Sequence, residues 1–79
     1  MRLDKFLKVS RILKRRTVAQ EACDLGKVYV NDRISKPGHK LKIGDIVKVE
    51  FASGTFAFKV LALNEKVKKE EADSLYEIL

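Results

Sequence analysis

Four positive charges stand directly before a residue that is well suited to begin a helix. Arg11, Lys14, Arg15 and Arg16 are followed by Thr17, whose hydroxyl can accept a hydrogen bond as an N-cap. The free N–H groups and the positive dipole end of a helix start favour phosphate. Arginine adds bidentate, weakly hydrated donors. The pattern therefore predicts a phosphate-binding surface.

Further cations flank this segment. Arg2, Lys5 and Lys8 precede it, and Lys27 follows the predicted second helix. A-form RNA presents phosphates, 2′-hydroxyls and shape more readily than base edges, which suits fixed Arg and Lys side chains. The alternative interpretation is a solvated basic face without a ligand. We predict an RNA-binding surface that comprises Arg2, Lys5, Lys8, Arg11, Lys14, Arg15, Arg16, Thr17 and Lys27.

The net charge of +6 is distributed unevenly along the chain. Residues 1–42 contain 12 Lys and Arg against 4 Asp and Glu, whereas residues 43–79 contain 5 against 7. A field concentrated on one part of a protein attracts and orients a polyanion. The distribution therefore favours a nucleic-acid partner.

The residue types that support catalysis are scarce. His39 is the only histidine and lies in a predicted loop, and no Cys or carboxylate cluster stands at metal-ligand spacing. The single cysteine, Cys23, lies within an apolar helical pattern and is interpreted as a buried hydrophobe. No Gly-rich phosphate loop or nucleophile elbow occurs. We expect a binding protein with no enzyme activity, cofactor or metal.

The apolar stretches are short. None approaches the roughly 18 residues of a membrane span, and the first residues lack the pattern of a secretory signal. We therefore expect a cytoplasmic protein that does not contact a membrane. The 79 residues suit one domain.

Two short helices are predicted in the first third of the chain. Leu3, Phe6 and Leu7 fall on one side of a helix from Arg2 to about Lys8. A connector follows, and its Ile12 and Leu13 can anchor to the core. A second helix is expected to begin at an N-cap on Thr17, with Gln20 at the capping-box return position, and to stop at Gly26, which adopts positive φ without steric cost.

Short strands and turns are predicted beyond Gly26. The segments 28–30, 46–51 and 55–63 alternate between apolar and other residues, and Asn31-Asp32 is a turn signal. We expect an α+β fold in which the two helices pack on a small, strongly bent antiparallel sheet.

The last residues are polar first and apolar later. We divide the chain into an RNA-binding domain, 1–64, and a C-terminal extension, 65–79. Ala72, Leu75, Tyr76 and Leu79 stand at helical spacing, which predicts a short helix packed back on the domain. A partly disordered tail is the alternative.

Two helices also allow a DNA-binding helix-turn-helix regulator as an interpretation from another class. Such a regulator requires polar base-reading side chains on its recognition helix. The second helix offers only Gln20, Glu21 and Asp24 outward, and two of these are anionic. Preference for RNA is therefore the stronger hypothesis.

Several motifs occur together in one order: residues 2–7 (RLDKFL), 14–19 (KRRTVA), 26–31 (GKVYVN) and 44–47 (GDIV). This series resembles the RNA-binding domain named after small-subunit ribosomal protein S-four, which has an alpha-L motif. The family motif usually has serine at the position of Arg15.

The resemblance extends to residues 35–37, 68–72 and 75–77. Over its whole length the chain is similar to the stand-alone branch of this family, which includes a small ribosome-associated heat-shock protein and the ribosome quality control factors of the RqcP type. The opening residues 2–11 and the segment 14–17 favour the quality control factors.

The resemblance implies a protein that binds large ribosomal subunits stalled with peptidyl-tRNA. We expect this protein to be a monomer. Such a protein contacts large-subunit rRNA and the P-site tRNA, and holds the tRNA while an RqcH-type factor adds alanine tails. Arg2 and Arg16 match the family's rRNA-binding arginines. The alternative within the family is a heat-shock-type rescue factor without a role in tailing.

Overall fold

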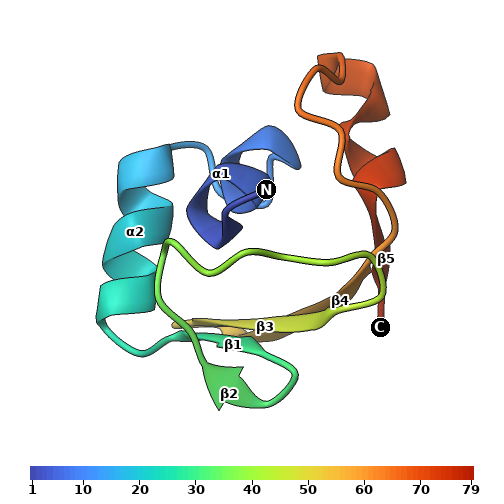
Figure 1. Ribbon diagram of the computed structural model, residues 1–79. Coiled ribbons are helices and arrows are strands. Elements are labelled where there is room, and N and C mark those ends of the chain that lie inside the picture. The colour runs from blue at the N-terminus through green and yellow to red at the C-terminus, as the bar shows by residue number, and fades with distance from the viewer.

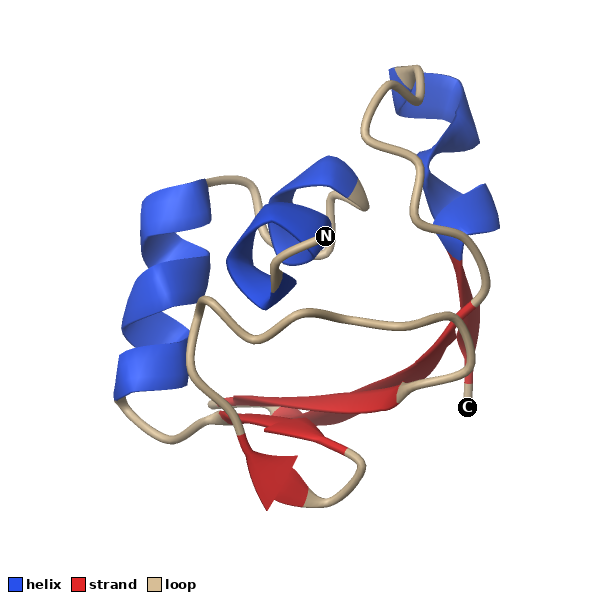
Figure 2. Cartoon of the chain, viewed as in Figure 1, coloured by secondary structure: helices blue, strands red, loops and turns tan.

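The alternating apolar residues of the chain form a five-stranded antiparallel sheet, and two helices cover one of its faces (Figures 1 and 2). The computed structural model describes residues 1–79. The strand order is β2-β1-β3-β4-β5. The predicted α+β fold with two N-terminal helices is confirmed. The elements are α1 (Leu3–Val9), α2 (Arg16–Asp24), β1 (Val28–Val30), β2 (Arg33–Ile34), β3 (Ile46–Phe51), β4 (Gly54–Val60), the 3-10 helix η1 (Lys69–Leu75) and β5 (Tyr76–Ile78).

The core lies between the helices and the inner face of the sheet. The apolar stripe of α1 is fully buried, as its spacing predicts. Phe6 of α1 stacks on Phe58 of β4, with ring centroids 5.9 Å apart and an interplanar angle of 13°. Ile12 and Leu13 of the connector pack against this core, as expected. The stack fixes α1 over the centre of the sheet.

Asn31 and Asp32 both have positive φ, so the predicted turn joins β1 to β2 as a tight hairpin. The fourth strand is shorter than the predicted segment 55–63. It ends at Val60 because the next two amides, of Leu61 and Ala62, donate to the Leu75 carbonyl instead of continuing the ladder.

The segment after β2 is attached to the start of the chain. The amide of Leu3 donates to the His39 carbonyl (2.8 Å), and the amide of Asp4 donates to the Pro37 carbonyl (3.1 Å). The amide of Leu41 returns to the Met1 carbonyl (2.9 Å). In Figure 1 this green segment rises from β2 and runs across the view above the sheet before it turns down into β3. Residues 1–4 and 37–41 therefore form one rigid unit.

The C-terminal residues are partly helical and partly a strand. Ala72 and Leu75 are buried from η1, as their spacing predicts. Tyr76 and Leu79 do not continue the helix, because Tyr76–Ile78 pairs with β4 as an antiparallel strand. The predicted short C-terminal helix is confirmed as η1, but it ends at Leu75, because β4 has a free edge whose backbone groups pair with the residues that follow.

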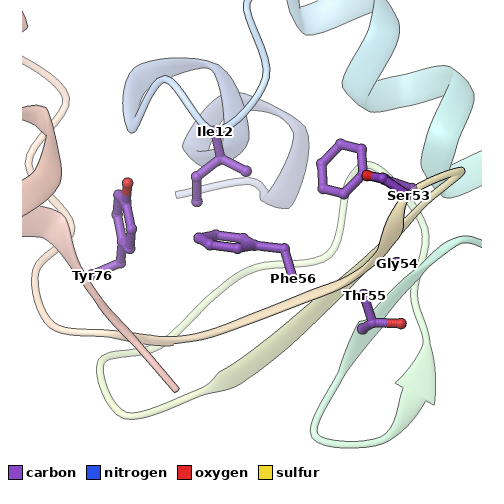
Figure 3. A pocket seen from close by; sticks show the side chains of 7 residues that line it. Ile12, Ser53, Gly54, Thr55, Phe56 and Tyr76 are labelled. Carbon is purple, nitrogen blue, oxygen red and sulfur yellow. The ribbon is translucent and has the colours of Figure 1, made fainter.

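The aromatic side chain of β5 closes one end of the core. Tyr76 meets Phe58 edge-on at 5.5 Å and Phe56 at 6.2 Å. Figure 3 shows Ile12, Phe56 and Tyr76 directed toward a common hollow of about 360 Å³, which no charged side chain lines. The hollow is therefore unsuited to phosphate.

Leu75→Ala is expected to lower the free energy of unfolding by about 2–5 kcal/mol, because the side chain is 1% exposed and its removal leaves a cavity. Urea denaturation measures the change. Leu79→Ala is the control, since Leu79 is 60% exposed and should change stability by less than about 0.5 kcal/mol. Equal effects would contradict the packing of η1 on the domain.

Candidate RNA interface

A buried carboxylate organises the basic residues near the N-terminus. Asp4 lies in the first turn of α1, and its side chain is 0% exposed. The Nε of Arg2 lies 3.2 Å from Oδ1, and the Nε of Arg16 lies 3.2 Å from Oδ2. Gln20 donates from Nε2 to Oδ2 at 2.9 Å, and the amide of Lys5 donates to Oδ1 at 2.8 Å. These contacts join the start of α1 to the first two turns of α2.

The network keeps Asp4 charged. Burial raises the pKa of this carboxyl, but hydrogen bonds from Gln20, Arg16 and the Lys5 amide together outweigh burial, so the pKa lies below its ordinary value of 3.8. The carboxylate therefore holds one edge of each guanidinium at neutral pH. The side chains of Arg2 and Arg16 remain 50% and 42% exposed, which leaves their other N–H groups available to an external acceptor.

The predicted N-cap on Thr17 is wrong. The N-cap is Arg15, with an extended backbone and no side-chain hydrogen bond, and α2 already begins at Arg16. Gln20 does not return to the helix start as a capping box requires, because its amide donates to Asp4. The exposed Thr17 stays beside Arg15 and Arg16 at the first turn of α2. Since Gln20 is engaged within the protein, α2 is a poor DNA-reading helix.

Three of the other predicted cations form a second group. Lys8, Arg11 and Lys14 line a hollow of about 350 Å³ together with Val9 and Val67. None of the three cations takes part in an ion pair. Arg11 has a φ of 63°, an uncommon backbone conformation for a residue with a side chain, which turns the chain at the end of α1.

Two predicted residues lie apart from both groups. Lys5 points toward the C-terminal part of the chain, where its Nζ lies 3.2 Å from Glu65. Lys27 follows the far end of α2, and the helix alone separates Arg16 from Asp24 by about 12 Å at 1.5 Å per residue. The structure thus places Arg2 with Arg16, and Lys8 with Arg11 and Lys14, but it does not bring all nine residues onto one spot.

Sequence reasoning missed Asp4 and Gln20. An acidic residue in the first turn of a helix is ordinarily interpreted as an exposed side chain that interacts favourably with the positive end of the helix dipole. The available signal was its position three residues before Leu7, which places Asp4 at the edge of the apolar stripe on the same side of the helix. A buried acid beside a basic segment indicates an ion-pair centre.

The remaining chemistry-bearing residues give no second type of site. Cys23 is 4% exposed in the core, as predicted, and burial raises the pKa of its thiol to about 11, which makes it unreactive. His, Cys, Asp and Glu side chains form no cluster that could hold a metal ion. No helix combines the length and apolarity needed for a membrane crossing.

The model of the S4 domain family matches residues 1–47. The chain is 48% identical over 79 residues to the RQC P-site tRNA stabilizing factor of Streptococcus pneumoniae. This match covers 100% of this chain and 90% of that protein. The Bacillus subtilis factor of the same name is 46% identical over 79 residues, with coverages of 100% and 92%. The chain belongs to the S4-domain family of RQC P-site tRNA stabilizing factors.

A solved structure agrees with this assignment. Trimeric heat shock protein 15 of Vibrio cholerae has a TM-score of 0.92 and 26% sequence identity, and the match covers 100% of this chain and 81% of that one. The RQC factors are therefore nearer in sequence, while the heat shock protein shares the fold. Arg2 and Arg16, the two arginines that contact Asp4, lie within residues 1–47, which match the S4 domain.

Proposed function

We propose that this protein binds large ribosomal subunits that carry a stalled peptidyl-tRNA and stabilises the tRNA in the P site during ribosome quality control. The observation that carries the proposal is the pair Arg2 and Arg16, held by Asp4 with half of each side chain exposed, in a chain 48% identical to such a factor over its full length. Fixed guanidinium groups bind phosphate without making or breaking covalent bonds. The protein therefore acts as a clamp and not as an enzyme.

Both basic groups bind RNA in this proposal. Arg2 and Arg16 bind large-subunit rRNA, and the hollow of Lys8, Arg11 and Lys14 binds phosphates as well. Arg2 and Arg16 are held by Asp4 and lose little freedom on binding, which supports the first assignment. The charges of Lys8, Arg11 and Lys14 are not compensated by any ion pair within the protein, which supports the second. Arg15 and Thr17 flank the first group at the start of α2, while Lys5 and Lys27 contribute long-range attraction from its periphery.

The proposal includes an RqcH-type factor as the partner that adds alanine to the stalled chain, and the cytoplasm as the compartment. It treats 1–64 as the RNA-binding part and 65–79 as its C-terminal extension. It also takes the protein to be a monomer. The short outer strands, with two residues in β2 and three in β5, support this because they offer little edge for pairing with another copy.

Deleting the gene is expected to abolish C-terminal alanine tails on stalled chains, because the tRNA would leave the P site before elongation. Immunoblotting of a stalling reporter measures the tails, and a plasmid copy of the gene is the control. Large subunits bearing tRNA should co-purify with the tagged protein. Undiminished tails in the deletion strain would rule out a role in tailing.

The fold similarity to heat shock protein 15 favours a second candidate, a rescue factor that acts on large subunits without supporting tailing. The same assay separates the two candidates. A rescue factor predicts normal tails in the deletion strain, together with altered amounts of tRNA on free large subunits.

A further inference from the structure

Besides the two basic groups, the structure contains a groove next to Arg2 that is the largest hollow on the molecule. Its volume is about 680 Å³. The groove runs between the β2 edge of the sheet and the segment that follows β2, and the same segment meets the N-terminus. The residues that line it are Arg2, Val30, Arg33, Ile34, Ser35, Lys36, Pro37, Gly38 and His39.

The charge of this groove is of one sign. Arg2, Arg33 and Lys36 line it together with His39, and no acidic side chain lines it. The nearest acid in sequence, Asp32, pairs with Lys48 (3.0 Å). Over residues 33–42 the chain holds four Lys and Arg and no Asp or Glu. Such a uniform lining raises the local concentration of an anion.

The groove is continuous with the Asp4-centred arginines. A Cβ placed on Gly38 would lie 3.8–4.0 Å from the guanidinium of Arg2, so the Gly38 backbone lies directly beside that group. Arg2 and Lys40 also form a backbone bridge. An extended anion bound to Arg2 can therefore continue directly into the groove.

The groove cations stand on ordered backbone. Besides the hydrogen bonds to residues 1–4, the Ser35 amide donates to the Val28 carbonyl at 3.0 Å. The Ser35 hydroxyl donates to the Arg33 carbonyl at 2.9 Å, and the His39 amide donates to the Lys36 carbonyl at 3.0 Å. Little backbone freedom would be lost on binding.

We propose that this groove binds the phosphodiester backbone of the same RNA strand that Arg2 and Arg16 hold, with Arg33 and Lys36 as its phosphate contacts. The inference rests on the proposed function for the identity of the RNA. An open, cationic groove fits an extended polyanion better than a small molecule, whose sites are mostly apolar and enclosed. The basic surface then extends beyond the two helices onto β2 and the following segment.

The test compares two double variants of the full chain that remove the same charge. The first variant, Arg33→Ala with Lys36→Ala, removes two cations from the groove. The second, Lys48→Ala with Lys59→Ala, removes two cations from the outer face of the sheet. Affinity for isolated large subunits carrying P-site tRNA is measured over a series of salt concentrations. We expect the groove variant to bind about tenfold more weakly, with a salt slope smaller by about 2, since each phosphate contact contributes about 1. The outer-face variant should change neither quantity appreciably.

Equal affinities and slopes for the two double variants would overturn the proposal. Reduced tailing with unchanged subunit binding would also overturn it, because the groove would then serve a protein partner. Thermal denaturation verifies that both variants fold. Arg33, Lys36 and Lys59 are exposed and the Lys48 side chain is 44% exposed, so the substitutions remove little packing. If the unaltered protein fails to bind these subunits, the proposed function fails instead. A short A-form RNA hairpin as probe then decides the groove by the same comparison of slopes.

Discussion

Arg16→Ala is expected to lower the affinity for large ribosomal subunits by about 10- to 100-fold. Hydrogen bonds to charged groups contribute about 1.5–3 kcal/mol each, and tenfold corresponds to 1.4 kcal/mol. Arg16 contributes twice, because its exposed N–H groups can donate to RNA while its Nε holds the carboxylate that also orients Arg2. Co-sedimentation with large subunits over a range of protein concentrations measures the affinity.

Lys48→Ala is the matched control for charge. Lys48 lies on the outer face of the sheet, where Asp32 already neutralises it, so its removal should barely affect binding. Equal losses for the two variants would mean that net charge, and not the arginine pair, carries the association. Arg16→Lys separates charge from geometry, because lysine lacks the fork with which Arg16 meets Asp4. We expect this variant to bind with an affinity between those of the alanine variant and the unaltered protein.

Asp4→Ala is expected to cause a comparable loss of subunit binding, although it makes the protein more positive. A simple attraction between charges would predict tighter binding to RNA. The structure predicts the opposite, because Arg2, Arg16 and Gln20 lose the common acceptor that orients them. The same co-sedimentation assay measures the change. Tighter binding by this variant would show that the arginines need no fixed orientation.

Asp4→Ala should also lower the free energy of unfolding, by about 1–3 kcal/mol. Breaking a fully buried ion pair costs about 3–5 kcal/mol because a charge stays buried without its partner. Here the two arginines are half exposed and can turn toward water, so the smaller range applies. Urea denaturation at neutral pH measures the difference.

The lowered pKa of Asp4 gives this contribution a pH dependence of known sign. A carboxyl whose pKa is lower in the folded than in the unfolded state stabilises the fold above its ordinary pKa, here 3.8. The contribution decreases as the pH falls below that value and is lost through the folded-state pKa. The difference in unfolding free energy between the unaltered protein and Asp4→Asn should therefore shrink below about pH 4. A constant difference down to pH 2 would contradict the network.

Local patterns were sufficient to predict much of the fold. The stripe of Leu3, Phe6 and Leu7 predicted α1, and the alternation in 46–51 predicted β3, because each signal depends on one element meeting one core. β5 was not predictable in this way. Its pairing depends on the free edge of β4, which is far away in sequence, and the spacing of Ala72 and Leu75 favoured a helix.

The site shows the same division between local and distant information. The cations of residues 1–16 were recognisable by type, but their separation into two groups depends on the turn at Arg11 and on the crossing of the helices. Helical periodicity gives the faces of each helix and not the relation between them. The position of Asp4 at the edge of the apolar stripe was visible in the sequence, but its pairing with Arg16 depends on how α1 and α2 cross.

The pairing of β5 with β4 covers a strand edge that could otherwise pair with a second copy of the chain. Without residues 76–78, the seven-residue β4 would present open backbone groups beside Phe56 and Phe58, a combination that invites self-association. During synthesis this edge stays uncovered until the last strand has left the exit tunnel. The segments that bear the arginines are synthesised before β5, so the basic residues of α1 and α2 emerge before this edge is covered.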